Sequence, residues 1–210
     1  MSSPTPKTAL ILIDPLNEFL HEKGKLISLL PDLTERNTIL NLRTLVNTVR
    51  EHKETRIPIF YGLHQHWTPH AFHDWQHMTD SHVAINQNHA FEKGSFGAEI
   101  FGGLGPVEES GDVVVSRHWN SNSFQNTDLD FQLRQRDITH LVFAGLTANT
   151  CLEASARHAY ELGYKVTILK DATAGFSKEL TDVATELVWP LFAEVLSVGE
   201  WVEKFFGAEV

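Results

Sequence analysis

Clusters of basic residues are missing from this sequence. Lys and Arg never form a block of more than two residues, and the formal net charge is −10. Nucleic acids and anionic membranes bind to a basic face that replaces their counterions. We therefore expect neither of them as a partner, and a neutral or cationic small molecule suits this charge better than a polyanion.

Cysteine is almost absent as well, since Cys151 is the single one among 210 residues. No disulfide can form within the chain, which suits a reducing compartment and leaves one free thiol. No apolar run approaches the roughly 20 residues of a membrane-spanning helix. The polar start of the chain also lacks the apolar segment of a signal peptide. We expect a cytoplasmic protein with one domain over residues 1–210, long enough to bury a sizeable core.

Short apolar runs alternate with amphipathic stretches along the chain. Residues 8–13 form a continuous apolar run, typical of a strand buried on both faces. Residues 36–52 carry apolar side chains at spacings of three and four, as in a helix with one buried face. Further strands are expected at 57–61, 112–116, 140–144, 165–169 and 194–198, and further helices at 127–136, 150–162 and 178–188 with a short one at the end. The pattern predicts a three-layer, doubly wound α/β fold with a mostly parallel sheet of about six strands and helices on both faces.

Reactive side chains follow several of these expected strands. Asp14 follows the first, Arg117 and His118 the third, Cys151 the fourth and Asp171 the fifth. In an open parallel sheet, ligands bind beyond the carboxyl ends of the strands. An acid, a basic group and the thiol are therefore expected at one edge.

Cys151 allows two interpretations. Many free cysteines are only small buried hydrophobes. However, Cys151 stands where a helix is expected to begin, and the N–H groups and dipole there favour a thiolate and lower its pKa. Asp14 would supply the base that a thiol nucleophile needs, although an acid before a proline at a strand end can also be a simple turn residue. The amides of the loop before Cys151 could stabilise an oxyanion.

Four segments in the same order resemble the isochorismatase-like cysteine hydrolases. The first, 10–19, has the family's opening of a strand, Asp, two residues, Gln or Asn, one residue and Phe. The others are the glycine-containing segment 94–100, the F-x-x-T-x-L-x-x-x-L helix at 124–133, and the nucleophile loop 144–151 with the following 156–163 and 171–172. The resemblance runs from about residue 8 to 198.

The resemblance implies an Asp–Lys–Cys triad, in which Asp14 takes the proton of Cys151 and the thiolate attacks a carbonyl carbon. It also implies a cis peptide bond between Leu146 and Thr147, which would present the backbone amides of Thr147 and Cys151 as an oxyanion hole. The family lysine is missing, because residues 116–119 read Ser-Arg-His-Trp.

Arg117 is our choice for the missing lysine, since it keeps a fixed positive charge near Asp14. Arginine cannot shuttle a proton at neutral pH, whereas His118 could, so both remain candidates. Phe19, His118 and Trp119 are predicted to bind substrate. Aromatic side chains could form an apolar pocket wall there, but packing in the core or in an oligomer would explain them equally well.

The stretch from 63 to 111 breaks the alternation, and loops of that length usually line or cover a site. It holds seven of the 12 histidines: His64, His66, His70, His73, His77, His82 and His89. Nicotinamidase relatives bind metal through an Asp-x-His core with further histidines, but residues 64–67 read His-Gln-His-Trp. Since a metal site needs oriented ligands, we predict neither a metal nor another cofactor.

Three functions are weighed. The leading one is hydrolysis of a small amide, or a related acyl C–N compound, through a thioester on Cys151. The second is hydrolysis of the isochorismate vinyl ether, with Asp14 as general acid and no need for a cysteine. The third is a ligand-binding member without activity, suggested by the missing lysine. Relatives form dimers or tetramers, so a homo-oligomer is also expected.

Overall fold

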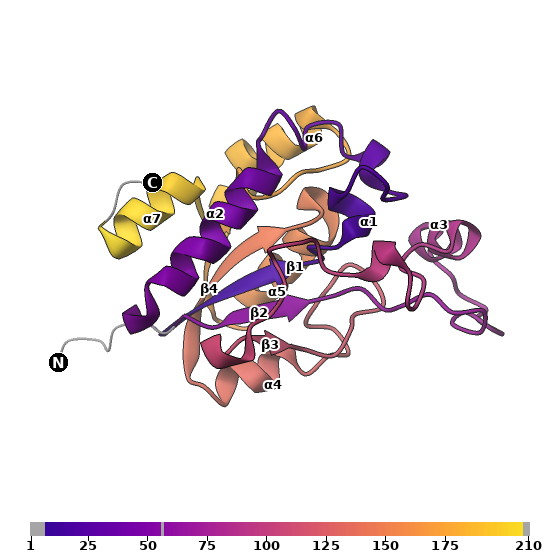
Figure 1. The fold of residues 1–210 in the computed structure, drawn as a ribbon, viewed down its shortest axis with the longest axis horizontal. Coiled ribbons are helices and arrows are strands. Elements are labelled where there is room, and N and C mark those ends of the chain that lie inside the picture. The colour runs from indigo at the N-terminus through magenta and orange to yellow at the C-terminus, as the bar shows by residue number, and fades with distance from the viewer. Residues whose placement is uncertain (1–6, 56, 208–210) are drawn as a thin grey trace.

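The structure is a computed structural model that describes residues 7–55 and 57–207. Six strands form one sheet in the order β3-β2-β1-β4-β5-β6, and every neighbouring pair is parallel (Figure 1). The strands are β1 (Lys7–Ile13), β2 (Ile59–Gly62), β3 (Val113–Val114), β4 (Ile138–Gly145), β5 (Lys165–Leu169) and β6 (Glu194–Leu196). The predicted α/β fold is confirmed.

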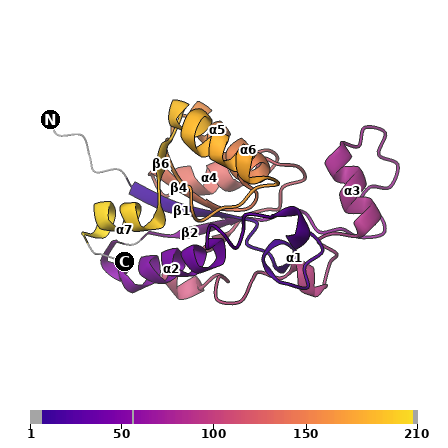
Figure 2. The ribbon, with the colours of Figure 1, turned by 90° about the horizontal axis from the view of Figure 1, so that it is seen from above.

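Helices cover both faces of the sheet. Figure 2 shows α2 and α7 on one side and α4, α5 and α6 on the other. The helices are α1 (Asn17–Leu20), α2 (Thr38–Glu51), α3 (Asp80–Asn88), α4 (Leu129–Arg134), α5 (Glu153–Glu161), α6 (Lys178–Val183) and α7 (Val198–Phe206). Single 3₁₀ turns lie at Ile27–Leu29, Lys53–Thr55, Phe96–Ala98, Glu108–Ser110 and Trp189–Leu191, and π-helical segments at Ala148–Leu152 and Ala184–Val188. No described helix has the length and apolar character needed to cross a membrane.

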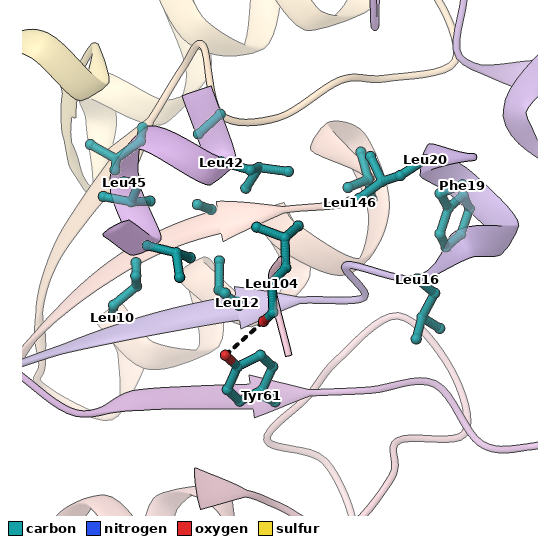
Figure 3. Packing of buried hydrophobic residues seen from close by; sticks show 14 of the residues in the cluster. Leu10, Leu12, Leu16, Phe19, Leu20, Leu42, Leu45, Tyr61, Leu104 and Leu146 are labelled. Carbon is teal, nitrogen blue, oxygen red and sulfur yellow. Dashed lines mark hydrogen bonds between the residues drawn. The ribbon is translucent and has the colours of Figure 1, made fainter. Parts of the chain in front are cut away.

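β1 lies between β2 and β4, so its side chains enter the cores on both faces of the sheet. Leu10 and Leu12 pack against α2 and α7, while Ile11 and Ile13 pack against α4 and α5. Figure 3 shows the first of these cores, where the Tyr61 hydroxyl donates a hydrogen bond of 2.8 Å to the Leu104 carbonyl. A strand buried on both faces needs the continuous apolar run that the sequence has here.

Three predicted boundaries differ in the structure. The last strand ends at Leu196 instead of reaching Val198, because Ser197 caps α7 in a capping box with Glu200. The third strand covers only Val113–Val114 instead of residues 112–116. The helix expected over 150–162 begins earlier, as the π-helical segment Ala148–Leu152, and continues as α5. Cys151 therefore lies inside this segment, ahead of α5.

The stretch between β2 and β3 contains α3 and extends away from the sheet (Figures 1 and 2). Its start returns to the carboxyl edge, where Gln65 N–H donates to the carbonyl of His118 and His118 N–H donates to that of Leu63. Farther along, the ring of His82 on α3 contacts the Trp119 carbonyl at 2.9 Å. The start of this excursion and α3 in its middle are thus both held against residues that follow β3.

Candidate active site

Asp14 lies at the carboxyl end of β1 and is fully buried. Its backbone has φ 45°, a left-handed conformation that is uncommon for residues other than glycine and often found at functional sites. Its Oδ1 accepts a hydrogen bond of 2.6 Å from the backbone N–H of His64, and its Oδ2 lies 3.2 Å from Nε2 of His118. The contact with His118 is that of an ion pair, since the two atoms are not aligned as in a hydrogen bond.

His118 is also fully buried, and both of its ring nitrogens face oxygen atoms. Nδ1 lies 2.5 Å from the carbonyl oxygen of Asn120, and Nε2 faces the Asp14 carboxylate. Both nitrogens can carry protons only in the imidazolium form. Burial alone would lower the pKa of His118, but the charge of Asp14 and the contact with it raise this pKa above its ordinary 6.5. The geometry and the pKa both indicate a positively charged His118.

The charge state of Asp14 follows from the same contacts. Burial works to raise its pKa, but the charge of His118 and the contacts with His118 and His64 outweigh burial and lower this pKa below the ordinary 3.8. Burial lowers the pKa of His64 from 6.5 to about 4, so its imidazole is neutral near pH 7. These surroundings favour the ionised form of Asp14, the protonated form of His118 and the neutral form of His64.

Cys151 reaches this group from the π-helical segment that follows β4. Its thiol lies close enough to Asp14 for the negative charge of the carboxylate to raise the pKa of the thiol, and the Thr147 backbone lies near the sulfur. The Thr150 hydroxyl also donates to the sulfur, at 3.8 Å. Only 9% of Cys151 is exposed.

The prediction that the helix start lowers the pKa of Cys151 is wrong for this resting site. Burial is the main cause that raises the pKa of Cys151 well above its ordinary value, and the negative charge of Asp14 raises it further. The contacts of the sulfur with the Thr150 hydroxyl and the Thr147 backbone act in the opposite direction but are outweighed. The resting pair is a neutral thiol beside a carboxylate.

The loop before Cys151 is held tightly against β1. The peptide bond between Leu146 and Thr147 is cis. Leu146 N–H donates to the Ile13 carbonyl at 2.8 Å, and Ala148 N–H to the Ala174 carbonyl at 2.9 Å. Gly145 has φ 112°, and a Cβ at this position would lie 2.0 Å from the Ile13 carbonyl oxygen. Glycine is therefore required where the loop leaves β4.

Arg117 is linked to Asp14 only through His64. Its guanidinium donates a hydrogen bond of 2.7 Å to the His64 carbonyl, and it is half-buried. Burial lowers the pKa of Arg117, while the charge of Asp14 partly offsets this effect. The structure thus brings His118, rather than Arg117, into contact with Asp14.

The other residues predicted to bind substrate have different surroundings. Phe19 lies in the core on α1 (Figure 3). Its ring centroid lies 5.5 Å from that of Phe91. Trp119 packs against Trp75 at 5.2 Å and borders a small pocket of about 270 Å³. The pocket is lined by Trp119, Asn120, Ser121, Asn122, Gln125 and Asn126. Since the carbonyl of Asn120 contacts His118, this pocket lies beside the buried site.

Comparison with known proteins assigns the family. A model of the isochorismatase domain matches residues 8–200. The chain belongs to the isochorismatase family. YwoC, an isochorismatase family protein of Bacillus subtilis (strain 168), is 29% identical over 202 residues, which cover 94% of each protein. This result confirms the resemblance inferred from the motifs.

Two further relatives of this isochorismatase-family chain have amidohydrolase or amidase names. Ureidoacrylate amidohydrolase RutB of Variovorax paradoxus (strain S110) is 35% identical over 114 residues, or 54% of this chain and 44% of RutB. The crystal structure of N-carbamoylsarcosine amidase from Thermoplasma acidophilum aligns with a TM-score of 0.65 and 25% identity, covering 92% of this chain and 98% of that one.

The sequence analysis did not predict His64 as a neighbour of Asp14, because it treated His64 only as a possible metal ligand. The sequence signal that could have revealed it is its position just after β2, the strand that pairs with β1. In the structure, the backbone N–H of His64 donates to Asp14. As for metals, no group of three His, Cys, Asp or Glu side chains within 7–55 and 57–207 is arranged to hold an ion. The candidate site of this isochorismatase-family chain comprises Asp14, His64, His118, Thr147 and Cys151.

Proposed function

We propose that this protein is a cysteine-dependent amidohydrolase that acts on a small amide or related acyl C–N compound through a thioester. The observation that carries the proposal is the proximity of the buried thiol of Cys151 and the ionised Asp14, which follow the paired strands β4 and β1. A thiol nucleophile needs such a base, because the thiolate is the form that attacks. The amidohydrolase and amidase names of two relatives support the same class of substrate.

The first half of the reaction forms the thioester. Asp14 takes the thiol proton while the sulfur of Cys151 attacks the carbonyl carbon, and the carbonyl electrons move to the oxygen. The N–H groups of Thr147 and Cys151 would donate to this oxyanion; one such donor typically contributes about 10²–10³ in rate. When the oxyanion collapses, the C–N bond breaks, and Asp14 returns its proton to the departing nitrogen. Ammonia or an amine leaves.

The second half releases the acid. Water attacks the thioester carbonyl as Asp14 removes one of its protons. The C–S bond then breaks, the carboxylic acid leaves, and the sulfur regains its proton from Asp14. The two halves together return the site to a neutral thiol and a carboxylate, so no outside oxidant or cofactor is consumed.

His118 has a clear electrostatic task in this scheme. One negative charge moves from Asp14 to the substrate oxygen and back, within a buried site where an unbalanced charge is costly. The imidazolium of His118, 3.2 Å from Asp14, balances that charge throughout. We infer that His118 takes the place of the family lysine, and that Arg117 supports it through the His64 carbonyl.

The pocket beside the site suggests the character of the substrate. Its six lining residues are one tryptophan, one serine and four amide side chains, without a charged group. Such a surface suits a compact, uncharged group with hydrogen-bonding ability, such as a carboxamide or a ureido group.

A substrate panel tests the proposed function. Small primary amides, ureido compounds and isochorismate are incubated with the wild-type protein, and ammonia and pyruvate release are measured. We expect ammonia release from at least one amide or ureido compound. If pyruvate from isochorismate were the only product, the vinyl-ether reaction would replace this proposal.

A charge at position 118 is expected to control the pH profile. Because the folded-state pKa of His118 lies above 6.5, its positive charge is present below that pKa and is lost as the pH rises through it. Activity should fall along the same alkaline limb. His118→Gln, which is neutral at every pH, should lower kcat by about 10²–10³.

His118→Lys is the matched control, since it restores a charge that persists to higher pH. We expect it to recover much of the activity lost in His118→Gln and to move the alkaline limb upward. The measurement is kcat against pH for the three proteins. An unchanged alkaline limb in His118→Lys would show that the charge of residue 118 has no part in the reaction.

A further inference from the structure

Glu18 on α1 is a buried acid that has no part in the reaction steps described above. Only 1% of Glu18 is exposed. Its Oε1 accepts a hydrogen bond of 3.0 Å from the backbone N–H of Phe91, and its Oε2 accepts one of 3.2 Å from that of Lys25. Acidic side chains are rarely buried in this way, because burial of a polar group is costly unless hydrogen bonds satisfy it. Glu18 therefore holds two distant backbone segments at one point.

The surroundings of Glu18 join two of the segments that resemble family motifs, 10–19 and 94–100. The side chain of Asn17 donates a hydrogen bond of 3.0 Å to the Phe96 carbonyl. The carboxyl group of Glu18 packs directly on Gly97, where a Cβ would lie 2.1 Å from Oε2. Any side chain at position 97 would therefore displace this carboxyl group, which explains the glycine in the second segment.

Phe91, which Glu18 contacts, has an uncommon backbone conformation. Its φ is 59°, in the left-handed region that favours glycine over a bulky residue. Residues in this region persist where the surrounding structure fixes them. Glu18 binds the N–H of Phe91, and the carbonyl of Phe91 accepts a hydrogen bond of 3.0 Å from the Trp67 N–H. Both sides of the strained residue are thus held by hydrogen bonds.

The contacts of Phe91 lead on to Asp14. The ring of Phe91 stacks on that of His64, with the centroids 4.7 Å apart and the planes 22° from parallel. Phe91 and His64 are both buried. The backbone N–H of His64 donates the hydrogen bond of 2.6 Å to Oδ1 of Asp14. A continuous path of contacts therefore runs from Glu18 through Phe91 and His64 to the Asp14 carboxylate.

We propose that Glu18 is a positioning residue, which holds the His64 N–H on the Asp14 carboxylate through Phe91. Without the carboxyl group of Glu18, Phe91 would be released from its left-handed conformation, and His64 would lose the ring that stacks on it. The consequence for catalysis rests on the proposed role of Asp14 as the base, whereas the positioning of His64 does not.

Hydrogen exchange measured by NMR tests the positioning of His64 directly. In Glu18→Ala, we expect the His64 amide to exchange at least about 10-fold faster than in the wild type, relative to the amides of β4. The β4 amides serve as the reference because they report opening of the whole fold. Gly97→Ala provides a second variant, since its methyl group would displace the carboxyl group while Glu18 stays in the chain. We expect the same local increase there.

Asp112→Asn is the matched control for the loss of a buried carboxyl group. The side chain of Asp112 is 1% exposed and accepts a hydrogen bond of 3.0 Å from the Val107 N–H. However, Asp112 directly precedes β3, at the opposite edge of the sheet from Asp14. In this variant we expect exchange at His64 to change only as much as exchange in β4.

The titration of Asp14 gives a readout that a general loss of stability would not move. His118, His64, Arg117 and Cys151 are the titratable groups around Asp14, and the hydrogen bond from His64 is one of the causes that lower the pKa of Asp14. In Glu18→Ala, the carboxyl-carbon NMR signal of Asp14 should therefore titrate at higher pH than in the wild type. Removal of an acidic neighbour would by itself act in the opposite direction, so an upward shift identifies the lost hydrogen bond.

The activity should follow the position of the base. We expect kcat of Glu18→Ala to fall about 10–100-fold with KM little changed, because the base is displaced while the substrate pocket is not. A normal kcat in a variant whose His64 amide exchanges fast would refute the catalytic consequence.

Two results would overturn the positioning itself. One is His64 exchange that rises no more than β4 exchange in both Glu18→Ala and Gly97→Ala. The other is an Asp14 titration in Glu18→Ala that stays in place or moves to lower pH. Both are measured without substrate, so a failure of the amidohydrolase proposal would leave these two readouts intact.

Discussion

Cys151→Ala is expected to abolish amide hydrolysis, with kcat/KM falling by at least about 10⁴-fold. Without the sulfur no thioester can form, and water alone would have to attack the unactivated amide. Because Cys151 is the single cysteine of the chain, no neighbouring thiol can take its place. The measurement is ammonia release from the best substrate of the panel, at equal protein concentrations.

The same variant separates the chemical alternatives. Vinyl-ether cleavage with Asp14 as general acid needs no thiol, so that activity would survive in Cys151→Ala. Rapid quenching of the wild type followed by mass spectrometry should also show the acyl group on Cys151. Amide hydrolysis that persists in Cys151→Ala would refute the thioester route.

Asp14→Asn is expected to lower kcat by about 10²–10⁴, because an amide cannot accept the thiol proton. The same substitution should make the thiol of Cys151 easier to ionise. The negative charge of Asp14 is one cause of the raised pKa of Cys151, so its removal should lower that pKa, although burial will keep it elevated. The variant should therefore be alkylated by iodoacetamide at lower pH than the wild type, while turning over substrate more slowly.

Asp171→Asn provides the control for this experiment. Asp171 follows β5 at the same edge of the sheet, and its Oδ1 accepts a hydrogen bond of 2.8 Å from the Val198 N–H, which asparagine can preserve. We expect the alkylation profile of Cys151 to be unchanged in this variant. If Asp14→Asn left the alkylation profile in place as well, the contact between the carboxylate and the thiol would be disproved.

The acid side of the pH profile follows from the same carboxylate. Its pKa is lowered in the folded protein, so the stability that Asp14 contributes is present above pH 3.8 and is lost as the pH falls through the folded-state value. In the wild-type protein, protonation of Asp14 at low pH should therefore lower both the activity and the free energy of unfolding. The loss of activity at high pH should instead follow the deprotonation of His118.

The sequence predicted those parts of the fold that depend on local pattern. The apolar run of β1 and the residues that follow β1 and β4 were sufficient to place Asp14 and Cys151 at one edge. The charge state of Cys151 was predicted wrongly, because it depends on how deeply the sulfur is buried, which no local pattern records. His118 and Arg117 are adjacent in the chain, and only the path of the backbone after β3 decides which of them faces Asp14.

The partners of Asp14 come from distant parts of the chain. His64 follows β2, His118 follows β3, and Cys151 follows β4, while Asp14 itself closes β1. None of these residues can contact Asp14 until the central strands have paired. Any partial opening that separates β1 from β4 would part Asp14 from Cys151, while the ion pair of Asp14 and His118 would remain on the β1 side of the opening. In the proposed mechanism, turnover therefore requires β1 and β4 to be docked, and we expect a molecule in which these strands have separated to be inactive.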